Sequence, residues 1–211
     1  MITTDQSIHD FVESLAARTP TPGGGSAGGC AAAMGAALLS MAGRFSQGKK
    51  HSEADAEDRL ERVLAVLDDK RAALLPMIER DASAFELVTE AYRLPKGDAQ
   101  AVEIRTRAIQ EALRGAMAVP EETLCLIRDV LVEFADVVTL IGRNIVSDVG
   151  SGTSLLEAAA SMAKLNVQIN MAYLEDRDLA SAAGERILAV MAEIEEHARR
   201  NHRIVRQLLE N

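Results

Sequence analysis

An uncharged run from Pro20 to Gly43 constrains the fold of this chain more than any other feature. It opens with the letters TPTPGGGSAGGC and continues in alanine, methionine and leucine. Small residues recur every three to four positions, for example at Gly25, Gly29 and Ala36, so that a neighbouring helix can approach closely. Because the segment is apolar nearly all round, it predicts a central buried helix, for which Ser26 is a suitable N-terminal cap.

The rest of the chain also shows helical periodicity. Pro76 should kink or divide one long helix, Pro120 should separate two others, and residues 149–153 should form a glycine break. The expected helices are a short one after Ser7, then 26–48, 52–94, 99–119, 120–145, 154–174 and 181–209. The prediction is an all-α fold, a single domain over residues 1–211. It is a helical bundle of about seven helices, with a glycine-rich loop before the central small-residue helix.

The composition supports helices and narrows the possible partners. Hydrophobic residues make up 48% of the chain but aromatic residues only 3%, which is typical of packed helices rather than sheets. A formal net charge of −9 disfavours nucleic acid and anionic membranes as partners. The two cysteines lie far apart in apolar runs, which indicates buried thiols in a reducing cytoplasm. The acidic first residues, up to Thr19, disfavour a signal peptide, and the prolines and small residues of 20–43 disfavour a membrane span.

The glycine run does not match a nucleotide-binding loop. A phosphate loop of the Walker type needs a lysine after its last glycine and a strand before its first, and residues 23–29 have neither. Glycines here let a ligand or a neighbouring backbone approach closely, and the following helix N-terminus offers free amides to an anion. The four histidines have no Cys or His companion at ligand spacing, so no metal site is expected.

Several polar residues occupy apolar helix faces. Asp81 lies three residues after Ile78 and four before Phe85, on a stripe expected to be buried. A carboxylate there must find a donor or a cation, or else become protonated, so it is either a structural group or a catalytic one. Asn166 and Asn170 are spaced i to i+4, which places both amides on one face, either to bind a heterocycle or to join helices.

Two further polar groups lie at predicted helix ends. Lys49 and Lys50 follow the small-residue helix, where cations complement the helix dipole. The segment from Arg143 to Asp148 precedes the expected glycine break, so its serine and aspartate are either helix caps or ligand contacts. The pattern alone leaves both interpretations open for each group.

Six segments together resemble the cyclodeaminase/cyclohydrolase family. They are Pro22-Gly-Gly-Gly-Ser26, Gly48-Lys-Lys50, Asp81-Ala-Ser-Ala-Phe85, Ala91-Tyr-Arg-Leu-Pro-Lys96, Asn144 to Asp148, and Leu165-Asn-Val-Gln-Ile-Asn170. Their order is that seen in the cyclodeaminase half of formiminotransferase-cyclodeaminase and in stand-alone bacterial methenyltetrahydrofolate cyclohydrolases. The resemblance covers essentially the whole chain but includes no formiminotransferase portion. One departure is Gly142, which stands where relatives often have an asparagine.

The resemblance implies an all-helical homodimer that acts on one-carbon tetrahydrofolates. The expected reaction is either hydrolysis of 5,10-methenyltetrahydrofolate to 10-formyltetrahydrofolate or cyclisation of 5-formiminotetrahydrofolate with release of ammonia. Asp81 matches the family's catalytic acid. No tightly bound cofactor is expected, and the expected substrate is a folate that can carry a polyglutamate tail. The other hypothesis is a non-catalytic helical scaffold that retains the fold. The expected substrate-binding residues are Pro22, Gly23, Gly24, Gly25, Ser26, Lys49, Lys50, Asn144, Ser147, Asp148, Asn166 and Asn170.

Overall fold

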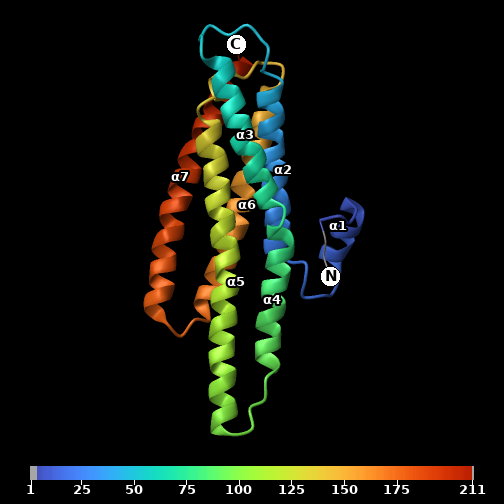
Figure 1. Ribbon diagram of the computed structural model, residues 1–211, viewed down its shortest axis with the longest axis vertical. Helices are drawn as coiled ribbons and strands as arrows, with labels where there is room; N and C mark the ends of the chain where they lie inside the picture. The colour runs from blue at the N-terminus through green and yellow to red at the C-terminus, as the bar shows by residue number, and fades with distance from the viewer. Residues whose placement is uncertain (1–3, 211) are drawn as a thin grey trace.

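The structure is a computed structural model that describes residues 4–210, and this part of the chain folds into helices without a β-strand. The all-helical prediction is therefore confirmed. Figure 1 shows a long bundle in which α2 to α7 run side by side, while α1 stands apart from it. The elements are α1 (Ile8–Ala16), α2 (Gly24–Arg44), α3 (Ala56–Leu74), α4 (Met77–Arg93), α5 (Ala99–Phe134), η1 (Val138–Leu140), α6 (Val146–Ala172) and α7 (Arg177–Glu210).

Helix α2 lies at the centre of the bundle, as predicted. It packs most extensively against α6 and also contacts α3, α4 and α5. A Cβ atom added to Gly35 would lie 2.9 Å from the carbonyl oxygen of Gly152, and one added to Gly152 would lie 2.9 Å from that of Gly35. The two backbones are therefore in direct contact. Helix α2 is long and apolar enough to cross a membrane by length and composition alone, and a core helix has the same composition.

The two prolines within helical segments act differently. Pro76 divides the predicted 52–94 helix, since α3 ends at Leu74 and α4 begins at Met77. Pro120, however, lies inside the continuous helix α5, so the prediction of two helices was wrong. Proline has no amide hydrogen and leaves the carbonyl of Ala116 without its helical donor. The side-chain amide nitrogen of Asn170 donates to that carbonyl at 3.3 Å, and the helix continues.

The predicted glycine break was also misplaced. Helix α6 runs through Gly150 and Gly152, because the second glycine provides the close contact with α2. The chain turns earlier, after Phe134, and passes through η1 before α6 begins. The apolar residues at 138, 141 and 145 are buried, as their pattern indicated, but they lie in this connection, which includes η1, rather than on one face of an α-helix. Apolar residues buried in a tight connection can have the same sequence spacing as apolar residues on the buried face of a helix, so the spacing did not distinguish the two.

Candidate functional site

A cavity of about 680 Å³ opens where α2 begins, between α4, α5 and α6. Asp81 is the one charged side chain among the described residues that line it. Three of the six Phe and Tyr side chains of the whole chain lie in its wall, where pattern analysis had counted Phe85 as core. The lining residues are Pro20, Thr21, Gly23, Gly24, Gly25, Asp81, Phe85, Val88, Thr89, Tyr92, Leu113, Ala116, Asn166, Ile169, Asn170 and Tyr173.

The glycine-rich segment forms the first turn of α2 rather than a loop before it. Gly23 is the N-cap and the helix begins at Gly24, so the prediction that Ser26 caps the helix was wrong. Glycine tolerates the N-cap position, which lets the helix begin earlier. Ser26 is instead fully buried against α4. Its hydroxyl oxygen lies 3.0 Å from the carbonyl oxygen of Ile78 and 3.0 Å from Oδ2 of Asp81.

The carboxyl group of Asp81 is packed against the backbone of α2. A Cβ atom added to Gly25 would lie 1.9 Å from Oδ1 of Asp81, so only glycine leaves room for this carboxyl group. The free amides of a helix N-terminus favour an anion at this place. Burial disfavours the charged carboxylate and raises the pKa of Asp81. Hydrogen bonds from the hydroxyl and the amide of Ser26 favour the carboxylate and lower that pKa. Burial has the larger effect, and the pKa lies above its ordinary value.

The Ser26 hydroxyl suits both protonation states of Asp81. A hydroxyl has one proton, so Ser26 can donate either to Asp81 or to the Ile78 carbonyl. When Asp81 is ionised, Ser26 donates to the carboxylate. When Asp81 is protonated, the carboxyl group can donate to Ser26, which then donates to Ile78. The contacts therefore accommodate a carboxyl group that gains and loses a proton.

Asn166 and Asn170 lie on the α6 wall of the same cavity. The side-chain nitrogen of Asn166 donates to the carbonyl of Met162 at 2.8 Å, and that of Asn170 donates to the carbonyl of Asn166 at 2.8 Å. Backbone carbonyls thus accept from both N–H groups of Asn170 and from one N–H group of Asn166. The side-chain oxygens are the atoms that remain to accept hydrogen bonds from a ligand.

Asn170 should also stabilise helix α5. Replacing Asn170 by alanine removes the donor to Ala116 and is expected to lower the free energy of unfolding by about 1 kcal/mol. In a Pro120→Ala background the backbone amide of residue 120 can supply that bond, so the same substitution should cost less. Chemical denaturation of the four proteins measures this coupling. Equal costs in both backgrounds would show that the Asn170–Ala116 bond contributes nothing.

The remaining predicted residues gather at the other end of α2. Gly24 faces Asn166 and Gly35 faces Gly152, so α2 and α6 run antiparallel. Asn144, Ser147 and Asp148 therefore lie near the end of α2 that leads to Lys49 and Lys50. The 20 residue steps of α2 separate its ends by about 30 Å. In Figure 1 the α2–α3 connection lies at the top, while α2 begins near mid-height.

We call these groups the carboxylate end and the lysine end. The carboxylate end comprises Pro22, Gly23, Gly24, Gly25, Ser26, Asp81, Asn166 and Asn170. The lysine end comprises Lys49, Lys50, Asn144, Ser147 and Asp148. Within one chain, the two ends do not meet.

Gly142 adjoins the lysine end. A Cβ atom added there would lie 2.9 Å from Oδ1 of Asn144 and 3.6 Å from Nζ of Lys49. Any larger residue at this position would therefore displace the side chain of Asn144. The glycine in place of the expected asparagine lets Asn144 lie close over the backbone.

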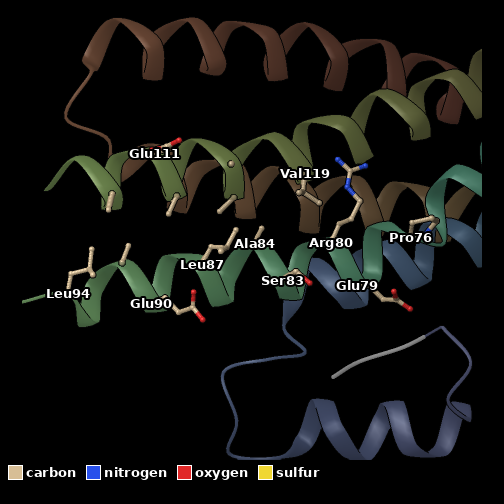
Figure 2. A pocket seen from close by; sticks show the side chains of 15 residues that line it. Pro76, Glu79, Arg80, Ser83, Ala84, Leu87, Glu90, Leu94, Glu111 and Val119 are labelled. Atoms are coloured by element: carbon tan, nitrogen blue, oxygen red, sulfur yellow. The ribbon is translucent and has the colours of Figure 1, made fainter. Parts of the chain in front are cut away.

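A second cavity, of about 820 Å³, lies between α4 and α5 (Figure 2). Although it is larger, its floor is built from alanine and leucine side chains, and the charged side chains are carried at its rim. Its arginine, Arg80, is paired with Glu122 through two hydrogen bonds of 3.0 and 2.6 Å. Apart from Ala116, none of its lining residues borders the carboxylate-end cavity. The carboxylate end is therefore the candidate functional site.

Comparison with known proteins agrees with this fold. The family model described as formiminotransferase-cyclodeaminase matches residues 7–189. The chain is 36% identical to a methenyltetrahydrofolate cyclohydrolase of Methylorubrum extorquens over 90% of each chain. It is 32% identical to the formimidoyltransferase-cyclodeaminase of Mus musculus over 92% of its own length, but it spans only 36% of that protein.

A solved structure gives the same result. The crystal structure of formiminotetrahydrofolate cyclodeaminase from Thermotoga maritima matches with a TM-score of 0.79 and 28% sequence identity, over 98% of this chain and 96% of that one. The fold and the buried carboxyl group at the start of the central helix thus define a helical protein of the cyclodeaminase class. The chain belongs to the formiminotransferase-cyclodeaminase family.

Proposed function

We propose that this protein is a one-carbon tetrahydrofolate enzyme that hydrolyses 5,10-methenyltetrahydrofolate, cyclises 5-formiminotetrahydrofolate, or does both. The observation that carries the proposal is the Asp81 carboxyl group, which is buried at the start of α2 in a cavity walled by aromatic side chains. The similarity over nearly the full length of a methenyltetrahydrofolate cyclohydrolase supports it. A carboxyl group with a raised pKa is suited to proton transfer near neutral pH.

In the hydrolysis, water adds to the carbon that bridges N5 and N10. The Asp81 carboxylate stabilises the cationic amidine and accepts a proton from the attacking water. In the tetrahedral intermediate the carbon–N5 bond then breaks, with its electron pair returning to N5. N5 takes the proton held by Asp81, and the hydroxyl proton of the intermediate is released as the formyl group forms on N10.

The cyclisation uses the same group for a different transfer. N10 attacks the carbon of the protonated formimino group on N5, whose nitrogen becomes a neutral amine, and Asp81 accepts the proton that N10 loses. Asp81 then donates this proton to the amine of the tetrahedral intermediate, which leaves as ammonia. Each reaction therefore needs one carboxyl group that both accepts and donates a proton, which the Ser26 contact accommodates.

The cavity wall suits a bicyclic heterocycle. Phe85, Tyr92 and Tyr173 offer flat apolar surfaces, and the oxygens of Asn166 and Asn170 can accept hydrogen bonds from ring nitrogens. We further propose that the substrate can have a polyglutamate tail and that the enzyme needs no tightly bound cofactor. It is a single-domain chain that acts as a homodimer in the cytoplasm.

An absorbance assay tests the proposed function. Purified protein is mixed with methenyltetrahydrofolate, and loss of the methenyl absorbance is compared with the loss in buffer. A parallel assay follows conversion of the formimino substrate. Faster change in either assay supports the enzyme, and the ratio of the two rates identifies the preferred reaction. If neither substrate is turned over, the protein is a scaffold that retains the family fold.

The pH dependence should follow the environment of Asp81. Hydrolysis needs the ionised carboxylate, so its rate should rise with pH through the raised pKa of Asp81. Since hydrogen bonds from Ser26 lower that pKa, Ser26→Ala should raise it and move the midpoint to higher pH. Rates measured against pH, with the buffer reaction subtracted, show the shift. An unchanged midpoint would mean that another group controls the profile.

A further inference from the structure

The chain contains two tyrosines and no tryptophan, and both tyrosines line the cavity at the carboxylate end. Tyr92 lies in the last turn of α4, and Tyr173 is the C-cap of α6. Their side chains are 44% and 60% exposed, so burial in the core does not hold either ring in place. A flat ligand binds best to walls that are already fixed, because ordering a mobile side chain on binding costs affinity.

Both tyrosines lie beyond the start of α2. The first turn of α2 faces Asp81 of α4 and Asn166 of α6. Both helices continue past these residues and end at or next to the tyrosines. Figure 1 shows α4 and α5 extending below the start of α2. Since α5 packs extensively against both α4 and α6, it is placed to hold the two helix ends that carry the tyrosines.

Two side chains of α5 donate to the tyrosine backbone. The last carbonyls of a helix have no amide donor within the helix, so a side chain that donates to one of them fixes the helix end. Nη2 of Arg105 donates to the carbonyl of Tyr92 at 3.1 Å. Nε2 of Gln110 donates to the carbonyl of Tyr173 at 3.2 Å. Each helix end is therefore tied to α5 through the tyrosine itself.

Each of the two side chains makes a second contact. The guanidinium carbon of Arg105 lies 5.5 Å from the centre of the Tyr92 ring, which is within the range of a cation–π interaction. Oε1 of Gln110 accepts from the backbone amide of Glu175 at 2.8 Å, so the Gln110 amide holds the turn after α6 at two points. Neither Arg105 nor Gln110 is among the residues that line the cavity. Their contacts are therefore with its walls.

We propose that Arg105 and Gln110 are positioning residues that hold the rings of Tyr92 and Tyr173 as fixed walls for the bicyclic part of the substrate. They do not touch the reacting atoms and act through the two tyrosines. A wall contacts the heterocycle equally in the ground state and in the transition state, so loosening it should raise KM and leave kcat nearly unchanged. The identity of the ligand rests on the proposed function, whereas the two tethers rest on the contacts of α5.

Steady-state kinetics with methenyltetrahydrofolate test this role. Arg105→Gln removes the cation and shortens the donor, so it should raise KM about tenfold, with kcat within about twofold of wild type. Gln110→Glu keeps the acceptor for Glu175 but loses the donor to Tyr173, and should raise KM about fivefold. Arg105→Lys retains a cation and a donor and should recover part of the lost affinity.

The matched controls make the same changes at exposed positions of α5. They are Arg107→Gln and Gln100→Glu, and both should keep the wild-type KM. A merely structural role for the two tethers would lower Tm and leave KM unchanged. Wild-type KM values in folded Arg105→Gln and Gln110→Glu proteins, with an active wild type, would therefore overturn the proposal.

Tyrosine fluorescence gives a readout that does not depend on turnover. Because the chain has no tryptophan, a Tyr173→Phe protein emits from Tyr92 alone, and a Tyr92→Phe protein emits from Tyr173 alone. Arg105→Gln in the first background and Gln110→Glu in the second should increase the quenching constant for acrylamide, since a released ring is more accessible. Unchanged quenching at a tyrosine would overturn its tether. Increased quenching in a protein whose wild type turns over neither folate would support the tethers and overturn the proposed function.

Discussion

Replacing Asp81 by asparagine is expected to lower turnover of methenyltetrahydrofolate by about 10²- to 10⁴-fold, the usual contribution of general acid–base catalysis. Asparagine has nearly the same shape, so the contacts with Gly25 and Ser26 can persist, but it cannot accept and return a proton. Steady-state rates at saturating substrate measure the loss. Asp69→Asn, an exposed aspartate on α3, is the matched control and should retain full activity.

The same substitution should leave the fold intact or stabilise it. Burial raises the pKa of Asp81 in the folded chain, so the folded state binds this proton more readily than the unfolded state does. The free energy of unfolding therefore falls as pH rises from the pKa of the unfolded chain to the raised pKa of the folded chain, and the cost is fully present above the latter. Asparagine has no such cost, so thermal unfolding at pH 7 should show an equal or higher Tm. Near wild-type turnover in a folded Asp81→Asn protein would refute the mechanism.

Gly25→Ala is expected to cost at least about 100-fold in turnover, although it adds a single methyl group. The new Cβ would lie 1.9 Å from Oδ1 and 2.3 Å from Cγ of Asp81, a distance that no packing permits. The carboxyl group must leave its place, and its contact with Ser26 is lost with it. Because alanine favours a helix more than glycine does, the loss of activity should exceed any loss of stability.

Gly115→Ala provides the matched control for this prediction. Gly115 is an exposed glycine of α5 that does not line the carboxylate-end cavity, and a Cβ atom added there would meet no atom within 4 Å. Turnover should stay within about twofold of wild type, as for other surface substitutions. Rates and Tm values of the two alanine variants, measured together, separate the effect of the clash with Asp81 from the general effect of alanine in a helix. Similar losses of activity in both variants would show that the clash at Gly25 does not control turnover.

The sequence predicted the helical class well because that prediction rests on periodicity. It failed where a distant residue supplied what the local sequence lacked. Pro120 should interrupt a helix, yet Asn170 donates to the carbonyl that Pro120 leaves free, and α5 continues. Gly152 should weaken a helix, yet its contact with Gly35 keeps α6 against α2. Neither partner can be recognised from residues nearby in the chain.

Part of the site could be predicted for a similar reason. A carboxylate on an apolar stripe and two asparagines at helical spacing stand out in any sequence, and the structure places all three at one cavity. The aromatic wall was missed because Phe85 was counted as a core residue. The scarcity of Phe and Tyr in this chain was the available signal, since half of them line this cavity. The lysines were grouped with Asp81 by resemblance, which gives the order of motifs but no distance between them.

The sequence by itself therefore determined that the chain is helical, that the uncharged segment lies at its centre, and that Asp81 loses water on folding. These conclusions follow from periodicity and from the cost of burying a charge. Only the tertiary structure decided that Asp81 lies against Gly25 and Ser26, and that one chain keeps its lysines about 30 Å away. Ser26 and Asp81 are 55 positions apart in the chain, so their contact depends on how α2 packs against α4. The lysines lie far from Asp81 because they follow the opposite end of α2, and a helix separates its two ends by its own length.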